Sequence, residues 1–330
     1  MPYRDAFRRA RCLVTGGLGF IGSNLAHRLV ELDADVALVD SLHPEHGGDR
    51  FNVAGLEDRV RIVVGDVCDR DAIGPLVADR DFVFNLAGQV SHLDSMRDPF
   101  GDMHANALAH LTLLEACRAT NPGVKVVYAS TRQVYGRPHY VPVDEQHPFH
   151  PTDINGIHKL AGERYHTIYD RIGHVRATSL RLTNTYGPRQ LMRHNRQGFV
   201  PWFIRLAIDG EEISLFGDGA QQRDFNYVDD VVEALLFAAA DDAANGEAFN
   251  LGASPPVSLR AFTEQLIAIT GTGSYRIEPF PTERKVIDIG DYWADWRKIE
   301  RVLGWRPQVP LAEGLRRTVD YYRSHRDRYW

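Results

Sequence analysis

The stretch TGGLGFIG, residues 15–22, constrains the fold of this chain more than any other feature. It follows RCLVT, residues 11–15, a nearly continuous apolar run typical of a strand buried on both faces of a parallel sheet. Beyond it, apolar residues recur at spacings of three and four over 21–32, which predicts one face of a helix. Glycines at three-residue spacing in that context predict a tight turn that places a dinucleotide pyrophosphate at the helix N-terminus. These glycines are Gly16, Gly19 and Gly22.

A carboxylate at the end of the next predicted strand indicates which dinucleotide binds. Asp40 ends DVALVD, residues 35–40. A carboxylate at this place accepts hydrogen bonds from a ribose 2′-hydroxyl and repels a 2′-phosphate, which favours NAD over NADP. We therefore predict NAD as the cofactor. The predicted binding residues of the turn, the helix start and the strand end are Gly16, Gly19, Phe20, Ile21, Gly22 and Asp40.

The rest of the chain repeats this alternation of strands and helices. Alternating elements of this kind predict an α/β fold, a Rossmann-type doubly wound parallel sheet with right-handed crossovers. After about residue 181 long polar loops replace the alternation, and we predict a smaller C-terminal substrate-binding region over the carboxyl edge of the sheet. Further strands are predicted at 35–40, 61–66, 81–87 and 125–130, and helices at 104–120, 228–240, 258–270 and 310–325. The predicted NAD-binding domain comprises 1–180 and 224–250, and the substrate-binding region comprises 181–223 and 251–330.

Composition excludes several classes of protein. The formal net charge is −6 and no block of lysine and arginine stands out, so we expect no nucleic-acid partner. No apolar run reaches the roughly 20 residues of a membrane helix, and the apolar stretch near the amino terminus is too short for a signal peptide. Cys12, Cys68 and Cys117 form no CxxC pair, which suits a reducing cytoplasm. The 14 histidines show no metal-ligand spacing, so we predict no metal site and mostly surface or loop histidines.

Seven motifs occur in the order found in one enzyme family. Together they resemble an extended short-chain dehydrogenase/reductase of the nucleotide-sugar epimerase/dehydratase group, similar to UDP-glucose 4-epimerases. The resemblance runs nearly end to end, which is specific for the family but not for one substrate. The motifs are TGGLGFIG, GDVCD (65–69), FNLAG (84–88), NALAHLTLLEACR (106–118), ASTRQVYG (129–136), NTYGPR (184–189) and RDFNYVDD (223–230).

The resemblance assigns expected roles to individual residues. It places Asp66 and Val67 at the adenine, Leu86, Ala87 and Gly88 beside the nicotinamide, and Lys159 at the nicotinamide ribose. Thr131 would hydrogen-bond the reacting sugar hydroxyl, and Asn106 would fix an inner helix against the sheet or serve as a buried structural amide. The residues expected to face the two phosphates of the nucleotide sugar are Asn184, Arg223, Arg284 and Lys285. The resemblance also implies a homodimer through the helices 104–120 and 156–171.

Three departures from the family pattern bear on the reaction. Dehydratases of the family carry an Asp-Glu pair for eliminating water where this chain has Arg132 and Gln133, which cannot exchange protons near neutral pH. Arg132 would instead hold a carboxylate, a phosphate or a polar sugar group, or pair with Asp144 or Glu145. Another departure is a histidine-rich loop, residues 137–153, whose histidines we expect to be solvated.

The second departure is Asn155, which stands where the family has its catalytic tyrosine, one helical turn before Lys159. An amide can orient a hydroxyl but cannot take its proton, and loss of a general base typically costs about 10²- to 10⁴-fold in rate. The sequence leaves the substitute open. One candidate is a water molecule relayed by Lys159. The others are the side chains of His158, His92, Tyr135 and Tyr186.

These observations predict an NAD-dependent epimerase of a nucleotide-activated sugar, with a hydride leaving and returning at a sugar carbon, C4 by resemblance. A dehydrogenase or decarboxylase of the same family would use the same pocket. A different class is a non-catalytic NAD-binding protein that kept the fold and lost the tyrosine. Retention of Thr131, Lys159 and the phosphate-facing arginines favours the enzyme.

Overall fold

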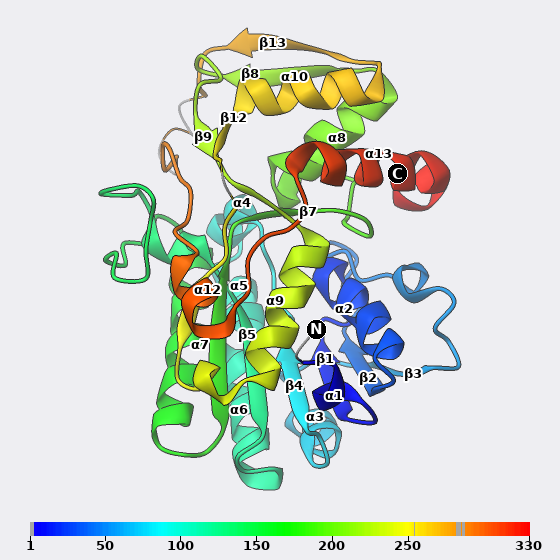
Figure 1. The fold of residues 1–330 in the computed structure, drawn as a ribbon, viewed down its shortest axis with the longest axis vertical. Helices are drawn as coiled ribbons and strands as arrows, with labels where there is room; N and C mark the ends of the chain where they lie inside the picture. The colour runs from blue at the N-terminus through cyan, green and yellow to red at the C-terminus, as the bar shows by residue number, and fades with distance from the viewer. Residues whose placement is uncertain (1–2, 254, 282–284, 286–287) are drawn as a thin grey trace.

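The computed structural model describes the chain except residues 1–2, 254, 282–284 and 286–287. The predicted doubly wound parallel sheet is confirmed: the described chain contains a seven-stranded sheet whose paired strands all run parallel (Figure 1). Its order is β11-β6-β5-β4-β1-β2-β3, so the direction of winding reverses between β1 and β4, where such sheets bind ligands. The strands are β1 (Arg11–Thr15), β2 (Asp35–Asp40), β3 (Val60–Val64), β4 (Phe82–Asn85), β5 (Lys125–Thr131), β6 (Arg176–Leu182) and β11 (Ala248–Asn250).

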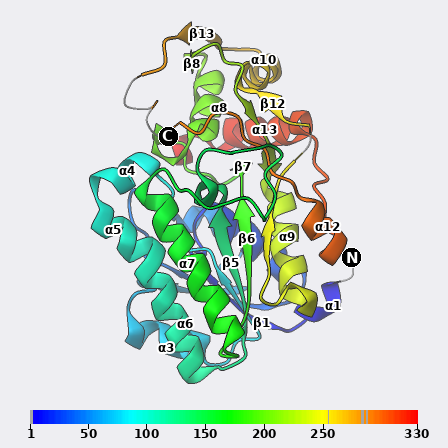
Figure 2. The ribbon, with the colours of Figure 1, turned by 90° about the vertical axis from the view of Figure 1, so that its left-hand side faces the viewer.

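Helices cover both faces of the sheet because its strands are apolar on both sides. One face packs against α2 (Phe20–Glu31) and α9 (Val228–Ala240), whose apolar residues join one buried cluster with the strands. The other face packs against α3 (Arg70–Val77), α6 (Ala109–Thr120) and α7 (Ile154–Arg171). Figure 2 shows α6 and α7 on one side of β5 and β6, with α9 on the other.

The later part of the chain forms a second layer above the carboxyl ends of the strands (Figure 1). Short parallel and antiparallel strand pairs build it together with three helices. The pairs are β7 (Asn184–Tyr186) with β10 (Phe225–Tyr227), β9 (Gln222–Arg223) with β12 (Val257–Ser258), and β8 (Glu212–Phe216) with β13 (Ser274–Glu278). The helices are α8 (Phe199–Asp209), α10 (Leu259–Thr270) and α13 (Leu311–Tyr329).

The final part of the chain also returns to the sheet. α12 (Arg297–Leu303) packs against β11, and Nζ of Lys298 donates to the carbonyl of Ala248 at 2.8 Å. The division of the chain into a cofactor part and a substrate part remains a prediction. Among the described helices, none is both long and apolar enough to cross a membrane.

The helix predicted at 104–120 begins differently from the expectation. Its first five residues form a π-helical turn, η2 (His104–Leu108), before α6 continues to Thr120. Such turns occur often at functional sites, and this one carries Asn106. The shorter elements are α1 (Arg4–Phe7), α4 (His92–Arg97), α5 (Pro99–Met103), η1 (Arg50–Val53), η3 (Arg132–Tyr135), η4 (Asn195–Gln197) and η5 (Asp242–Ala244).

Candidate active site

A cleft of about 1240 Å³ lies where the carboxyl ends of the strands meet the second layer. Its lining brings together nearly all residues singled out in the sequence, from the glycine turn to the β9 arginine. These are Gly16, Gly19, Phe20, Ile21, Gly22, Asp40, Asp66, Val67, Leu86, Ala87, Gly88, Thr131, Arg132, Gln133, Asn155, Lys159, Asn184 and Arg223. The described lining does not include Lys285, which is exposed, and Arg284 lies outside the described residues.

The glycine turn has no room for side chains. Gly16 has φ +65°, and a Cβ on Gly22 would lie 2.2 Å from the carbonyl oxygen of Gly16. α2 starts directly after Gly19, and no side chain caps its first amides. The first N–H groups of a helix lack partners within the helix, so this end offers donors and a partial positive charge to an anion. The turn therefore fits a dinucleotide pyrophosphate.

Asp40 lines the cleft at the end of β2, as a ribose acceptor would. Its Oδ2 accepts the amide of Leu18 at 3.0 Å, and its Oδ1 accepts the amide of Leu42 at 2.9 Å. Burial raises the pKa of the Asp40 carboxyl, and these amide hydrogen bonds oppose that shift. A carboxylate has about four lone-pair sites, so two bonds leave it capacity to accept ribose hydroxyls.

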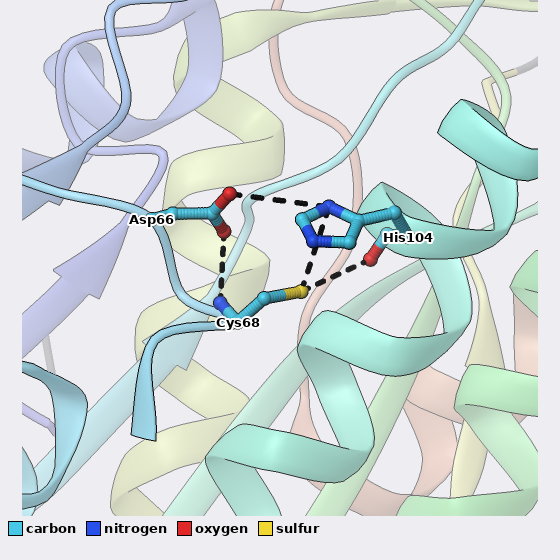
Figure 3. Close-up of side chains that lie close together, drawn as sticks. All are labelled: Asp66, Cys68 and His104. Atoms are coloured by element: carbon cyan, nitrogen blue, oxygen red, sulfur yellow. Dashed lines mark hydrogen bonds and ion pairs between the residues drawn. The ribbon is translucent and has the colours of Figure 1, made fainter. Parts of the chain in front are cut away.

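The expected adenine end of the cleft contains a small cluster of metal-type side chains (Figure 3). Ligand atoms of Asp66, Cys68 and His104 lie within 4.8 Å of one another, and Cys68 Sγ is 3.7 Å from Nδ1 of His104. Asp66 Oδ1 already accepts the amide of Cys68 at 2.8 Å, and burial raises the pKa of the Cys68 thiol to about 12. A thiolate is the form that binds metal. The absence of a metal site stays a prediction, as does the position of the adenine beside Asp66.

Lys159 is aimed at the expected nicotinamide side of the cleft. Its side chain is buried, and a Cβ on Gly88 would lie 2.7 Å from its Nζ, so the ammonium rests against the Gly88 backbone. Burial lowers the pKa of Lys159 to about 8, while the charge of Asp102 opposes that shift. Within the described chain no hydrogen bond holds this ammonium, although it lies 5.6 Å from the ring centroid of Tyr128. It is therefore free to bind a ligand hydroxyl.

Asn155 is locked by hydrogen bonds. Its Nδ2 donates to the carbonyl of Gln89 and to Oδ2 of Asp102, both at 2.9 Å. Asn106 donates to the same two acceptors from the π-helical turn, at 3.0 and 3.1 Å. Both N–H bonds of the Asn155 amide are thus used inside the protein, and its remaining polar atom, the carbonyl oxygen, cannot take a proton.

A histidine–carboxylate pair lies beside this amide. His92, the first residue of α4, hydrogen-bonds through Nδ1 to Oδ2 of Asp153. The other ring nitrogen, Nε2, lies 2.6 Å from Nε2 of Gln133. His92 lines the cleft and its side chain is 35% exposed, whereas that of Asp153 is 2% exposed.

The remaining proton-transfer candidates from the sequence lie elsewhere. His158 bonds Oδ1 of Asp102 through Nδ1 at 2.7 Å, and the described lining of the cleft does not include it. The hydroxyl of Tyr135 bonds Asn250 and Arg181, and that of Tyr186 donates to the carbonyl of Leu311. Both tyrosines are fully buried, and burial raises the pKa of each.

Arg132 and Arg223 place two guanidinium groups in the cleft. Arg223 donates to the carbonyls of Gln222 and Gly290 at 2.8 and 2.5 Å, and Arg132 lies over the ring of Tyr292. Among the described residues neither arginine has a carboxylate within ion-pair distance, so the suggested pairing of Arg132 with Asp144 or Glu145 is wrong. Burial lowers the pKa of Arg223 to about 10, and the charge of Arg132 adds to that shift. Two unpaired, partly desolvated cations favour an anionic ligand.

Most of the 14 histidines lie at the surface or in loops, as expected, but three of them are buried. His110 and His166 are fully buried on helices, where Nδ2 of Asn85 donates to both rings. His147 in the histidine-rich loop is also buried, and it accepts the amide of His139 at 2.9 Å, so it is structural rather than solvated.

The sequence did not single out the aromatic wall of the second layer. The start of α8 and the end of β8 line the cleft with Phe199, Trp202, Phe203 and Phe216. A run of aromatic residues after the Gly198 helix start was the signal for this wall. Asp153 was also missed, because a helix N-cap is its ordinary interpretation.

Comparison with known proteins gives consistent matches. Residues 12–252 match the NAD dependent epimerase/dehydratase family. The UDP-glucose 4-epimerase of Mycolicibacterium smegmatis is 34% identical over 315 residues, 95% of this chain and 99% of that protein. The structure of UDP-glucose 4-epimerase with UDP-glucose from Thermotoga maritima has a TM-score of 0.86 and 33% identity, covering 96% of this chain and 99% of that one. DesIV, a dTDP-glucose 4,6-dehydratase from Streptomyces venezuelae with NAD and TYD bound, has a TM-score of 0.86 and 30% identity, covering 96% and 98%.

Proposed function

Because the chain belongs to the NAD-dependent epimerase/dehydratase family, we propose that it is an NAD-dependent epimerase of a nucleotide-activated sugar, inverting C4 through a transient keto sugar. Its cofactor is NAD. The observation that carries the proposal is the combination in one cleft of Thr131, Lys159 and the two arginines, without an acid pair at 132–133.

Each part of the cleft has a task in this reaction. Bound NAD supplies a hydride acceptor that later returns the hydride. Thr131 at the end of β5 orients the sugar hydroxyl, and the Lys159 ammonium binds the nicotinamide ribose and favours loss of a nearby proton through its charge. Arg223, Arg132 and Asn184 bind the diphosphate and the sugar. The aromatic wall of α8 and β8 packs against the nucleotide.

The residues at 132–133 favour epimerisation over elimination of water. A dehydratase needs a donor and an acceptor of protons at the C5–C6 bond, and an arginine with a glutamine supplies neither near neutral pH. Oxidation without return of the hydride, or decarboxylation of the keto sugar, would use the same cleft. The identity of the product distinguishes these two reactions from epimerisation.

The test is turnover of a panel of UDP-, TDP-, GDP- and CDP-sugars in D₂O, followed by NMR and mass spectrometry. We expect an epimer that carries no solvent deuterium at the inverted carbon and no accumulation of NADH, because the same hydride returns. Accumulating NADH, or released CO₂, would identify a dehydrogenase or a decarboxylase. A product lighter by one water and labelled with deuterium would contradict the proposal in favour of a dehydratase.

We also propose a homodimer built on α6 and α7, in the cytoplasm. Large apolar side chains lie exposed on α7 and on the segments before α6: Ile157 is 48% and Ile168 46% exposed on α7, and before α6 Phe100 is 76% and Leu108 41% exposed. A second copy of this face would bury them in a four-helix contact. The free thiols of Cys12, Cys68 and Cys117 suit the reducing cytoplasm.

A further inference from the structure

The proposed function, on which this inference rests, needs a group that takes a proton from the sugar hydroxyl. In this chain the place of the catalytic tyrosine holds Asn155, whose amide donors are both bound to Gln89 and Asp102. The amide oxygen that remains is neutral and does not accept a proton at neutral pH. Another group must therefore do this work.

The hydrogen bond to Asp153 fixes which nitrogen of a neutral His92 ring is free to act as a base. Asp153 is nearly inaccessible, and as the N-cap of α7 its Oδ1 accepts the Gly156 amide at 2.7 Å, which fixes the carboxylate. Its Oδ2 bonds Nδ1 of His92. Because a carboxylate only accepts hydrogen bonds, Nδ1 carries the proton of the neutral ring. The lone pair of the neutral ring is therefore on Nε2.

Gln133 is suited to both states of this nitrogen. With the ring neutral, the Nε2–H of Gln133 donates to Nε2 of His92 at 2.6 Å. The Oε1 of Gln133 is buried and has no partner among the described residues. Once His92 carries a second proton, rotation of the amide brings Oε1 to accept it. Gln133, which stands in place of the glutamate of dehydratases, thus provides a partner before and after proton transfer.

The charges around the pair favour the ionised form of Asp153. Burial would raise the pKa of Asp153, but the hydrogen bond and charge of His92, the Gly156 amide and the charge of Arg132 lower it below its ordinary value. Asp94, on the same helix as His92, pairs with Arg196 at 3.6 Å. Asp153 is therefore an anion held against the His92 ring, and the charge of Arg132 keeps this carboxylate ionised.

The other histidine and the two tyrosines fail on geometry. His158 makes a similar pair with Asp102, but its side chain is 16% exposed and lies outside the described lining of the cleft. Asp102 itself is inaccessible and already accepts from Asn106, Asn155 and His158. Tyr135 and Tyr186 are buried away from the cleft.

We propose that His92, held by Asp153, is the catalytic acid–base residue of this enzyme. The proton of the sugar hydroxyl passes to Nε2 of His92 as the carbon–oxygen single bond becomes a carbonyl, and His92 gives the proton back to the oxygen when the carbonyl is reduced from its opposite face. Bound NAD would accept the hydride of the same carbon in the first half of the cycle and would return it in the second. No external oxidant or reductant is consumed.

The test compares His92→Gln with His158→Gln in the NAD-loaded enzyme, on a nucleotide sugar that the wild type turns over. Both variants exchange a carboxylate-bound ring for an amide that can still donate to the carboxylate. We expect kcat to fall by about 10²- to 10⁴-fold in His92→Gln, with KM and bound nucleotide changed by less than about threefold, and the limb of the pH–rate profile that reports the base to vanish. His158→Gln should keep kcat within about threefold.

Two further variants exclude a merely structural role. Imidazole in the buffer should restore part of the turnover of His92→Ala, since it supplies the missing base. Asp153→Asn keeps the helix cap, because asparagine caps as well as aspartate, but it should lower kcat at least tenfold by removing the anion.

The two proposals fail in different ways. An epimer formed by His92→Gln at the wild-type rate would overturn the role of His92 and leave the epimerase intact. Net oxidation or decarboxylation that depends on His92 would overturn the epimerase and support the base. Absence of turnover by the wild type with every nucleotide sugar would overturn both.

Discussion

Replacing Lys159 by methionine should stabilise the protein and abolish its activity. The side chain is buried in the cleft, and burial lowers the pKa of its ammonium from 10.5 to about 8. Lys159 therefore binds its proton more tightly in the unfolded chain than in the native state. Its charge lowers the free energy of unfolding by the full amount below pH 8 and by progressively less between pH 8 and 10.5. At about 1.36 kcal/mol per pKa unit, the cost is about 3 kcal/mol at pH 7 and about 1.4 kcal/mol at pH 9.5.

The assay is denaturant unfolding of the nucleotide-free protein at both pH values. Lys159→Met should raise the free energy of unfolding by about 3 kcal/mol at pH 7 and by roughly half as much at pH 9.5. Because we propose that Lys159 binds the nicotinamide ribose and promotes proton loss, turnover should also fall at least 100-fold.

Lys125 provides a matched control. It is equally buried at the start of β5, far along the strand from the cleft, and burial lowers its pKa to about 8 as well. Its Nζ donates to the Asp241 carbonyl and to Oδ1 of Asn245. Lys125→Met loses both bonds, about 1 kcal/mol each, so the net gain should be only about 1 kcal/mol and turnover should persist. A stability gain for Lys159→Met that is absent at pH 7, or equal at both pH values, would refute the reasoning.

Three further substitutions test other parts of the account. Gly22→Ala places a methyl group 2.2 Å from the Gly16 carbonyl oxygen, so the purified protein should lose its bound nucleotide. Gly74→Ala in α3, where an added Cβ meets nothing within 4 Å, should keep the nucleotide. Equal nucleotide content in both variants would be inconsistent with the glycine turn as the pyrophosphate-binding site. Arg223→Lys keeps the charge but loses the planar guanidinium group, so KM for the nucleotide sugar should rise about tenfold or more. Arg276→Lys on exposed β13 should leave KM unchanged. An unchanged KM in Arg223→Lys would show that Arg223 does not bind the substrate. If α7 forms the dimer contact, Ile168→Asp should give monomers in light scattering. Ile277→Asp, at a position that is 45% exposed on β13, should remain a dimer. Dimers in both variants would place the interface elsewhere.

The fold followed from the sequence wherever strands are apolar throughout. The runs at 11–15 and 35–40 coincide with β1 and β2, and the glycine turn joins β1 to α2 as predicted. The interior strand β6 gave no such signal because its sequence RATSLRL is half polar. Arg181 is buried there because Glu163 neutralises it through two hydrogen bonds, at 2.6 and 3.0 Å. A pairing between residues eighteen positions apart on different elements cannot be inferred from hydrophobic spacing.

The site residues that belong to local sequence motifs could be predicted, whereas those brought together only by the fold could not. Local motifs supplied the glycine turn, Asp40, Thr131 and Lys159, and these line one cleft. The position of His92 depends on Asp153, 61 residues later, and on Gln133, 41 residues later. His92 follows β4, whereas Gln133 and Asp153 both follow β5, and the parallel packing of these neighbouring strands brings the three residues together.

The most direct test of the central claim is a crystal structure of the enzyme with NAD and its nucleotide sugar bound. We expect Nε2 of His92 within about 2.6–3.2 Å of the hydroxyl on the carbon that faces the nicotinamide, with Thr131 bonded to the same oxygen. A hydroxyl that meets Thr131 and another proton acceptor, with His92 beyond hydrogen-bond reach and no water between them, would contradict the account.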